Sequence, residues 1–355
     1  MRRIFLIIFL ITALIFIEII NWIFLFLDYI IYPQFKKTDV KPPLFITGMP
    51  RSATTLCHVF LAADSVNFSS MKLWEILFAP SIIQKKLVLT IKKIDAIFHH
   101  KLARALSLFD RYFFKKMEDI HPVSFFDFEE DEYLLIHILS TSSFIFMFPK
   151  NKRLVSLHLF DRNLTDRQKR FIMRFYRNCI KRHLYVFGES KRYLAKSPSY
   201  TQRIRTFQHF FPGCQFIYML RNPANTLAST LNLYRRFRKI FHVEMDMEAI
   251  IDQTLSMADQ YYQYPLVTCD QLVGKSVFIV KFNELTSDTI KTIQLIYNLL
   301  VQELPDKYRN FLNTSRELPG KHISKSKSTL EEFGLKKESI SERYNIVYQK
   351  YPDIE

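Results

Sequence analysis

The sequence predicts an α/β protein with a mostly parallel central sheet, a long helical insertion between the first two strands, and a hydrophobic helix ahead of them. Apolar runs of strand length alternate with stretches of helical spacing, a pattern typical of parallel sheets. A long segment rich in Phe, Lys and Arg separates the first two runs, and an uninterrupted apolar run precedes both. We expect strands near 44–47, 193–196, 215–220 and 277–281, and helices near 54–63, 200–210, 223–238 and 286–302.

The composition is that of a folded protein with an anionic partner. The 355 residues are enough for one large domain or two small ones, and 48% hydrophobic and 24% charged residues exclude disordered, collagen-like and disulfide-scaffold proteins. The formal charge of +16 predicts a nucleotide, an anionic lipid or an acidic glycan as partner, rather than a nucleic acid. The four cysteines form no C-x-x-C pair and the histidines show no metal spacing, so we expect no metal.

The first apolar run contains only two charged residues, Glu18 and Asp28. It exceeds the roughly 7–15 residues of a signal-peptide core and the ~20 residues that cross a bilayer, so we predict residues 1–33 as a single uncleaved membrane anchor and 34–43 as a linker. Glu18, Asn21 and Asp28 fall on one helical stripe. A charge at the bilayer centre costs about 2.5–3.5 kcal/mol, so this stripe is expected to face protein or the interface. Basic residues flanking the run favour a cytoplasmic body by a small margin.

A strand, a loop and a helix follow the linker. The loop reads Gly48-Met49-Pro50-Arg51-Ser52-Ala53-Thr54-Thr55, and such a unit points loop N–H groups and a helix N-terminus at one spot, where a phosphate can bind. The loop lacks the Lys of a phosphate-loop kinase, because Thr54 stands in that place and the cation is Arg51. We therefore expect anion binding and transfer without a metal. The alternative is a basic turn followed by an ordinary core helix.

Two further predicted strands also end in a cation. One ends at Arg221, with Ser229 on the helix that follows, so that the two side chains can share one phosphate. The other ends at Lys196, followed by Ser197 and a proline. Because the carboxyl ends of strands in an open parallel sheet converge on one crevice, the three cations are expected to line a single anion-binding site.

These segments resemble the sulfotransferase family that uses 3′-phosphoadenosine 5′-phosphosulfate (PAPS). The segment 48–55 is similar to the family's 5′-phosphosulfate loop, G-x-P-R-S-G-T-T, in the version shared by bacterial carbohydrate-type and tyrosylprotein enzymes. Arg221 with a Ser eight positions on resembles its 3′-phosphate motif, and Lys196 with the next two residues resembles its K-[SDN]-P strand end. The likeness runs from about Pro43 to the C-terminus. Ala53 departs from it by replacing the loop Gly, which costs about 1 kcal/mol if that position needs a positive φ.

The resemblance implies a P-loop-NTPase-like three-layer fold for residues 44–355, with the helical insertion at about 74–187 on the acceptor side. It also implies sulfuryl transfer from PAPS to a hydroxyl of a carbohydrate, lipid or other acceptor, with no metal. A nucleotide kinase and a non-catalytic, membrane-bound nucleotide-binding protein are the alternatives. The implied donor-binding residues are Gly48, Pro50, Arg51, Ser52, Ala53, Thr54 and Thr55 for the 5′ end, and Arg221 and Ser229 for the 3′-phosphate.

Sulfuryl transfer needs a base for the acceptor hydroxyl and cations for the departing phosphate oxygen. We assign the cationic role to Arg51 and Lys196. For the base we choose Glu75, which follows the loop at about the interval where the tyrosylprotein branch keeps its Glu. The alternative is a structural role, as a helix cap or as an ion-pair partner of Arg51. The rival bases are Glu129, Asp131 and His121.

The insertion also contains a run from Gln84 to Lys116 that combines many cations with Leu, Ile and Phe. Such a composition fits a segment that lies on a membrane or holds an acidic acceptor. It equally fits a solvated pair of basic helices.

Overall fold

The computed structural model describes residues 2–117, 123–145, 147–241, 246–315 and 328–354. Labels with η mark 3-10 or π turns. The first part of the chain forms α1 (Arg2–Ile31), η1 (Pro33–Lys37), β1 (Leu44–Gly48), α2 (Thr54–Ala62), β2 (Phe68–Ser69), α3 (Leu73–Leu77), α4 (Ile82–Ile97), α5 (Lys101–Phe114), η2 (Lys115–Met117), η3 (Asp131–Ile138), α6 (Lys152–His158), α7 (Phe160–Asn163) and α8 (Asp166–Phe187). The second part forms β3 (Arg192–Lys196), η4 (Pro198–Arg203), α9 (Ile204–Phe210), β4 (Gln215–Leu220), α10 (Pro223–Phe241), α11 (Met247–Gln263), η5 (Tyr264–Thr268), η6 (Asp270–Leu272), β5 (Val277–Lys281), α12 (Phe282–Ser287), α13 (Thr289–Leu299), α14 (Asp306–Thr314), η7 (Glu331–Phe333), α16 (Lys337–Arg343) and α17 (Asn345–Lys350).

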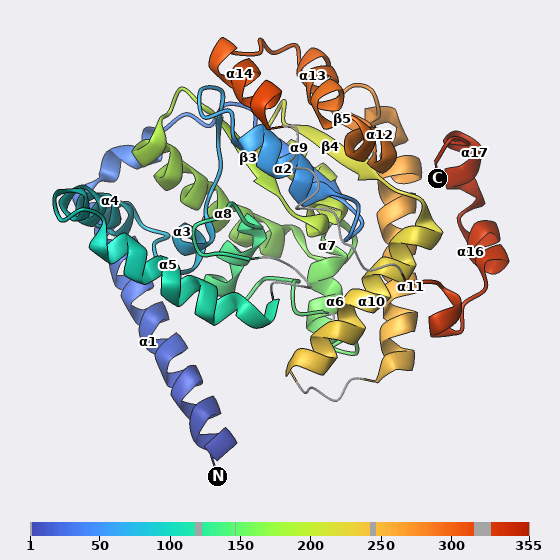
Figure 1. Cartoon of the computed structure of the whole chain (residues 1–355), viewed down its shortest axis with the longest axis horizontal. Helices are drawn as coiled ribbons and strands as arrows, with labels where there is room; N and C mark the ends of the chain where they lie inside the picture. The colour runs from blue at the N-terminus through green and yellow to red at the C-terminus, as the bar shows by residue number, and fades with distance from the viewer. Residues whose placement is uncertain (1, 118–122, 146, 242–245, 316–327, 355) are drawn as a thin grey trace.

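A parallel sheet with the strand order β2-β3-β1-β4-β5 forms the centre of the molecule (Figure 1). β1 lies in the middle, so that Ile46 is paired with Lys196 of β3 on one side and with Ile217 of β4 on the other. The predicted α/β fold is confirmed, and the structure adds β2 to the four strands expected. β2 has only two residues and therefore no apolar run that could reveal it.

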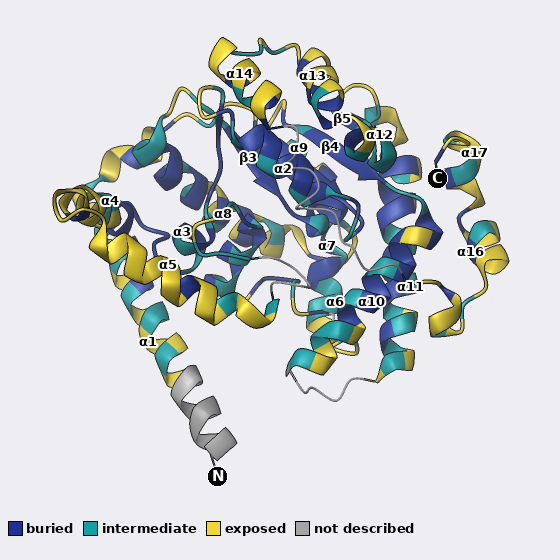
Figure 2. Cartoon of the chain, viewed as in Figure 1, coloured by how far each residue is buried: buried dark blue, intermediate teal, exposed yellow. Residues whose placement is uncertain are grey.

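Helices cover both faces of the sheet, which explains why the strands read as continuous apolar runs rather than alternating ones. Phe45 of β1 belongs to one hydrophobic core, together with side chains of α8, α9 and α11. Ile46, the next residue, belongs to the second core, formed with α2, α13 and α14. In Figure 2 the sheet is buried between these two layers, which gives the three-layer arrangement.

The helix α1 packs against the body along its second half and leaves it toward the N-terminus (Figure 1). The Asp28 carboxylate accepts hydrogen bonds from the N–H groups of Ile82 and Ile83, at the start of α4, and lies 2.9 Å from Nε of Arg182 on α8. Asn21 donates to the carbonyl of Leu77 at 3.0 Å. The polar stripe of α1 therefore faces protein. The segment Thr12–Ile31 is long and apolar enough to cross a membrane by length and composition alone.

Candidate functional site

The loop between β1 and α2 has an unusual backbone. Gly48 ends β1 at φ 147°, and a Cβ there would meet the carbonyl oxygen of Met219 on β4 at 2.5 Å, so no larger residue fits. Arg51 and Ala53 both adopt positive φ values, 71° and 64°. Ala53 therefore occupies the left-handed region that a glycine would favour. Position 53 does need a positive φ, so the replacement of the family's loop Gly by Ala has a conformational cost.

Hydrogen-bond donors at the start of α2 are left for a ligand. The N-cap, Ala53, makes no side-chain hydrogen bond to the first turn, and the carbonyl of Ala53 accepts the first intrahelical bond, from Cys57. The preceding N–H groups, at Thr54 and Thr55, therefore have no partner from within the helix. The Ser52 hydroxyl is buried without a hydrogen-bond partner among the residues that the structure describes. An anion at this helix N-terminus would satisfy these donors.

Two of the three expected cations meet at this loop. Arg221, at the end of β4, donates from Nη1 to the carbonyl oxygen of Arg51 at 2.7 Å. Arg51 in turn donates from Nε to the Ser229 hydroxyl on α10 at 3.2 Å. The Arg221 guanidinium also lies over the Phe282 ring, 4.0 Å from its centroid. The predicted 5′ and 3′ elements are thus adjacent and linked by hydrogen bonds.

Among the described residues, no carboxylate compensates the charges of these two arginines. In the described parts of the chain, neither Arg51 nor Arg221 forms an ion pair with a carboxylate. Burial and the nearby Arg236 lower the pKa of Arg51. Burial, together with the charge of Arg51, lowers the pKa of Arg221 to about 10, although Tyr262 acts in the opposite direction. A cluster of like charges in a partly desolvated place is electrostatically suited to a multiply charged anion.

Lys196 lies beside β1, but its charge is compensated. Its Nζ is 2.9 Å from Oε1 of Glu130 and 3.8 Å from Oε2 of Glu129, and its side chain is fully buried. Burial alone would lower the pKa of Lys196, but the two carboxylates outweigh it and raise that pKa. Glu130 also accepts a hydrogen bond from the Ser197 hydroxyl at 3.2 Å. Glu130 is the carboxylate that sequence reasoning passed over, since only its place in the fold brings it to Lys196.

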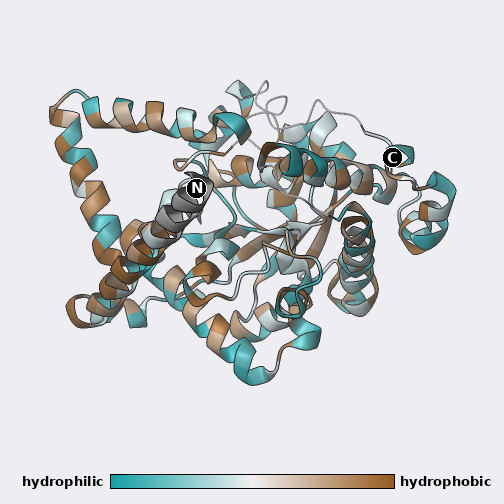
Figure 3. Ribbon diagram, turned by 90° about the horizontal axis from the view of Figure 1, so that it is seen from below, coloured by the Kyte–Doolittle hydropathy of each residue, from teal (hydrophilic) through white to brown (hydrophobic). Residues whose placement is uncertain are grey.

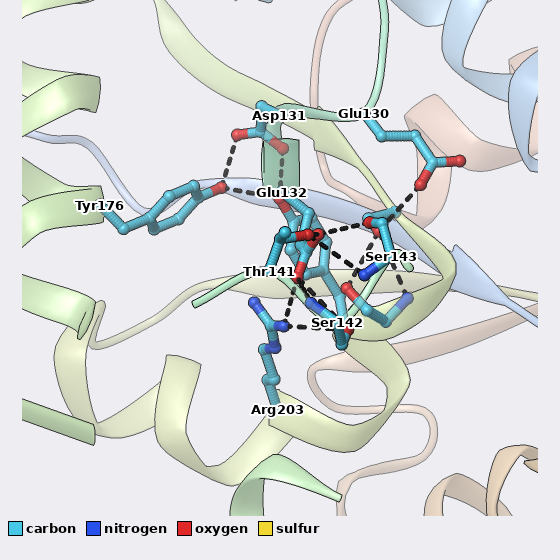
Figure 4. Close-up of polar contacts among 11 residues, drawn as sticks. Glu130, Asp131, Glu132, Thr141, Ser142, Ser143, Tyr176 and Arg203 are labelled. Atoms are coloured by element: carbon cyan, nitrogen blue, oxygen red, sulfur yellow. Dashed lines mark hydrogen bonds and ion pairs between the residues drawn. The ribbon is translucent and has the colours of Figure 1, made fainter. Parts of the chain in front are cut away.

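The residues that follow Glu130 hold it in position (Figure 4). Asp131 accepts hydrogen bonds from three tyrosine hydroxyls, including those of Tyr176 and Tyr193 at 2.6 Å. Glu132 pairs with Arg203 at 2.7 Å. Burial raises the pKa of Asp131 to about 6, against the lowering effect of the three hydroxyls. Both oxygens of Asp131 are thus engaged, and Glu130, at 2.9 Å, lies closer to Lys196 than Glu129 does, at 3.8 Å.

Glu75 has different surroundings. It is buried at the third position of α3, where its carboxylate accepts a hydrogen bond from the N–H of Lys72 at 2.9 Å, as in a capping interaction. Its other oxygen lies 3.2 Å from Nδ1 of His183 and 3.9 Å from Nζ of Lys85. Burial alone would raise the pKa of Glu75, but His183 and Lys85 outweigh it and lower that pKa. These contacts do not include Arg51 or Lys196.

The remaining expectations can be placed more briefly. His121, one of the rival bases, lies outside the described residues. No group of three or more His, Cys, Asp or Glu side chains suited to a metal occurs in the described part of the chain. Arg236 was not expected, because its proximity to Arg51 depends on how α10 crosses the end of β1.

Comparisons with known proteins agree with this geometry. A family model described as "Sulfotransferase family" matches residues 42–306. The crystal structure of sulfotransferase STF9 from Mycobacterium avium is similar over 94% of this chain and 82% of its own, with a TM-score of 0.71 and 17% sequence identity. That of sulfotransferase STF1 from Mycobacterium tuberculosis H37Rv is similar over 92% and 83%, with a TM-score of 0.61 and 17% identity. At such identities these structures show a shared fold. No curated protein matches the chain.

Proposed function

Because the chain belongs to the sulfotransferase family, we propose that it transfers a sulfuryl group from PAPS to a hydroxyl of a carbohydrate or lipid acceptor. The choice of PAPS as the donor rests on one observation. The loop after β1 and the end of β4 bring two arginines together without a carboxylate partner among the described residues, next to a buried hydroxyl with no partner. PAPS has two anionic ends, a 5′-phosphosulfate and a 3′-phosphate, and this site offers donors for both.

The two ends would bind to different parts of the site. Gly48 and Pro50 shape the loop, and its donors, Arg51, Ser52, Thr54 and Thr55, would hold the 5′-phosphosulfate. Arg221 and Ser229 would hold the 3′-phosphate. Hydrogen bonds to charged groups contribute about 1.5–3 kcal/mol each, so loss of either arginine is expected to weaken donor binding at least tenfold.

In the reaction, the acceptor oxygen forms a bond to sulfur while the bond between sulfur and the 5′-phosphate oxygen breaks. The acceptor proton goes to a base, and negative charge develops on the departing oxygen, where Arg51 stabilises it. Lys196 takes part in this stabilisation if it exchanges its contact with Glu130 for one with the phosphate. The raised pKa keeps Lys196 charged for this role.

Two carboxylates are candidates for the base. Glu75 remains our first choice from the sequence, although its lowered pKa and its contact with His183 would make it a weak base in this state. Glu130 is partly exposed and already lies against Lys196, so a proton accepted by Glu130 stays inside the site. Replacement of each by Gln separates them, because Gln keeps the shape and removes the basicity.

We also propose attachment of the protein to a membrane through α1, with the body on the cytoplasmic side. Thr12–Ile31 has a mean hydropathy of 2.1 over its most apolar window, of which only 17% is buried in the body. An acceptor that is a membrane lipid or a lipid-linked glycan would then diffuse in the plane of the same bilayer.

The test uses the full chain in detergent and membrane extract as a source of acceptors. The chain incubated with PAPS labelled at sulfur is expected to label an acceptor without added Mg²⁺, whereas a kinase would transfer phosphate from ATP. Binding of the product 3′,5′-bisphosphate should weaken tenfold or more in Arg221→Ala. Arg235→Ala is the matched control, because Arg235 lies on α10, the helix that follows Arg221, but is half-exposed and paired with Glu332. Equal affinity of the unmodified chain for ligands with and without the 3′-phosphate would contradict the assignment.

A further inference from the structure

The helices α4 and α5 form an arm that projects from the body with its apolar side chains exposed. Asp95, near the end of α4, accepts hydrogen bonds from the N–H groups of Leu102 and Ala103 and so fixes the corner between the two helices. Beyond the first turn of α4 most side chains are in contact with solvent (Figure 2). The exposed large apolar residues of the arm are Leu87, Val88, Ile91, Ile94, Ile97, Phe98, Leu102, Leu106, Leu108, Phe109, Tyr112 and Phe113.

These residues follow helical spacing. Leu87, Ile91 and Ile94 lie on one stripe of α4, and Leu102, Leu106, Phe109 and Phe113 lie on one stripe of α5. Leu87 is 52% exposed and Phe109 is 54% exposed, so no part of the chain that the structure describes covers these stripes. Soluble monomers rarely expose a contiguous apolar patch of this kind, and such patches mark sites of interaction with proteins or membranes.

The exposed charges of the arm all have one sign. Its two acidic residues, Asp95 and Asp110, are buried, and Asp110 accepts a hydrogen bond from the N–H of Phe125. Every other charged side chain between Ile82 and Met117, apart from the buried Lys85, is an exposed cation: Lys86, Lys92, Lys93, Lys101, Arg104, Arg111, Lys115 and Lys116. Apolar stripes bordered only by cations are complementary to an anionic lipid surface.

The outer face of α1 is also apolar. Phe16, Ile19, Ile23 and Phe26 are exposed on the side of α1 opposite to the buried Asn21 and Asp28. Figure 3 looks at the molecule from the side toward which α1 points, with α4 along the left edge, α5 along the top and α1 between them, and it shows apolar residues on all three helices.

The way α1 is held brings a bilayer close to the body. Glu18 lies 2.9 Å from His137, and Asp28 is buried against Arg182, so the second half of α1 cannot separate from the body without breaking these pairs. The part before Glu18, from Arg2 to Ile17, is about 24 Å long at 1.5 Å per residue. This is shorter than the ~30 Å hydrocarbon core of a bilayer. A membrane that takes up this part of α1 therefore reaches the body.

We propose that α4, α5 and the outer face of α1 together form one surface that lies in the interface of an anionic membrane. The arm thus contributes a second contact besides the N-terminal helix and fixes the orientation of the body on the bilayer. The single sign of the exposed charges favours lipid over a second copy of this chain, because two such arms would repel each other. The proposal does not depend on the chemistry at the donor site.

Fluorophores attached to single cysteines can test this in the full chain. The four native cysteines are buried, so a cysteine introduced on the surface is the preferred site of labelling. Ile97→Cys and Phe109→Cys place an environment-sensitive fluorophore on α4 and α5, and Phe16→Cys places one on α1. Val301→Cys is the matched control, because Val301 is 94% exposed and lies between α13 and α14, away from the arm. Each variant is reconstituted into vesicles of phosphatidylglycerol and phosphatidylcholine, with pure phosphatidylcholine for comparison.

We expect emission from positions 97 and 109 to shift to the blue in the anionic vesicles and to be quenched by nitroxides on the lipid chains, with a smaller effect in neutral vesicles and none at position 301. Quenching at position 16 alone would mean that α1 is the sole membrane contact and would overturn the proposal. A blue shift at 97 and 109 without quenching by lipid nitroxides would show that protein covers the arm, and would also overturn it. Because these variants leave the donor site intact, their binding of 3′,5′-bisphosphate reports on the proposed function separately.

Discussion

Replacement of Ala53 by Gly is expected to stabilise the protein. Ala53 has φ 64° and ψ 22°, which an L-residue adopts at a cost of about 1–2 kcal/mol. Gly removes this cost, but it raises the conformational entropy of the unfolded chain by an equivalent of about 0.4–1 kcal/mol and loses the contact of one methyl group with the core around α2. The free energy of unfolding should therefore rise by up to about 1 kcal/mol. For a chain of this size that corresponds to an increase in Tm of about 1–3 °C.

The matched control is Ala62→Gly, at the other end of α2. Ala62 is helical and nearly buried, so Gly there loses helix propensity and packing, and the free energy of unfolding should fall by at least about 0.5–1 kcal/mol. Thermal unfolding followed by circular dichroism in detergent, at one protein concentration, compares both variants with the unmodified chain. We expect Tm to rise in Ala53→Gly and to fall in Ala62→Gly, although the two positions lie at the ends of the same helix.

The reasoning is refuted if Ala53→Gly lowers Tm as much as Ala62→Gly does. That outcome would mean that position 53 has an ordinary negative φ in solution, so that the loop is not shaped as a phosphate cradle. The same variant bears on activity. A loop relieved of strain should bind the 3′,5′-bisphosphate at least as tightly as the unmodified chain, measured by calorimetry.

Three further outcomes are expected. Glu75→Gln should lower turnover about a hundredfold with bisphosphate affinity unchanged within a few-fold; if Glu130→Gln does so instead, the base is Glu130. Asp28→Asn leaves a buried arginine without its carboxylate and should lower the free energy of unfolding by about 3–5 kcal/mol in urea titrations, whereas Asp246→Asn, in an exposed pair, should change it by less than about 0.5 kcal/mol. Burial raises the pKa of Asp131 to about 6 from 3.8, so the folded state binds the proton more tightly, and the resulting stabilisation is present at low pH and lost as pH rises through 6. The difference in Tm between the unmodified chain and Asp131→Asn should therefore shift in favour of the unmodified chain as the pH is lowered from 7 to 5. A shift in the opposite direction would contradict this assignment.

The sequence predicts the strands and the strand–loop–helix unit around residues 48–55 well, because both depend on neighbouring residues. The residues Phe216–Leu220 are all apolar or aromatic because helices cover both faces of the sheet, and such a run can be recognised in the sequence without knowledge of its neighbours in the fold. The contacts of Glu130 and Arg236 are different. Each depends on how a distant segment crosses the end of a strand, so that no spacing in the chain relates Glu130 to Lys196 or Arg236 to Arg51. Residue type therefore points to Arg51 and Lys196 but not to the charged residues beside them, which are a carboxylate for Lys196 and a further cation for Arg51.

The presence or absence of a carboxylate partner distinguishes the cations that stabilise the fold from those available to a ligand. Arg182, Lys196 and Arg203 are buried, and each lies within 3 Å of a carboxylate oxygen. Removal of such a partner is costly, so these pairs are fixed parts of the fold unless a ligand supplies another anion, as proposed for Lys196. Arg51 and Arg221 are partly desolvated, repel each other, and have no carboxylate partner in the described residues. An anion that binds this pair binds only the folded state, so it must stabilise the protein as well as occupy the site. We therefore propose that the repulsion between Arg51 and Arg221, which a bound anion would relieve, contributes to the affinity for the donor.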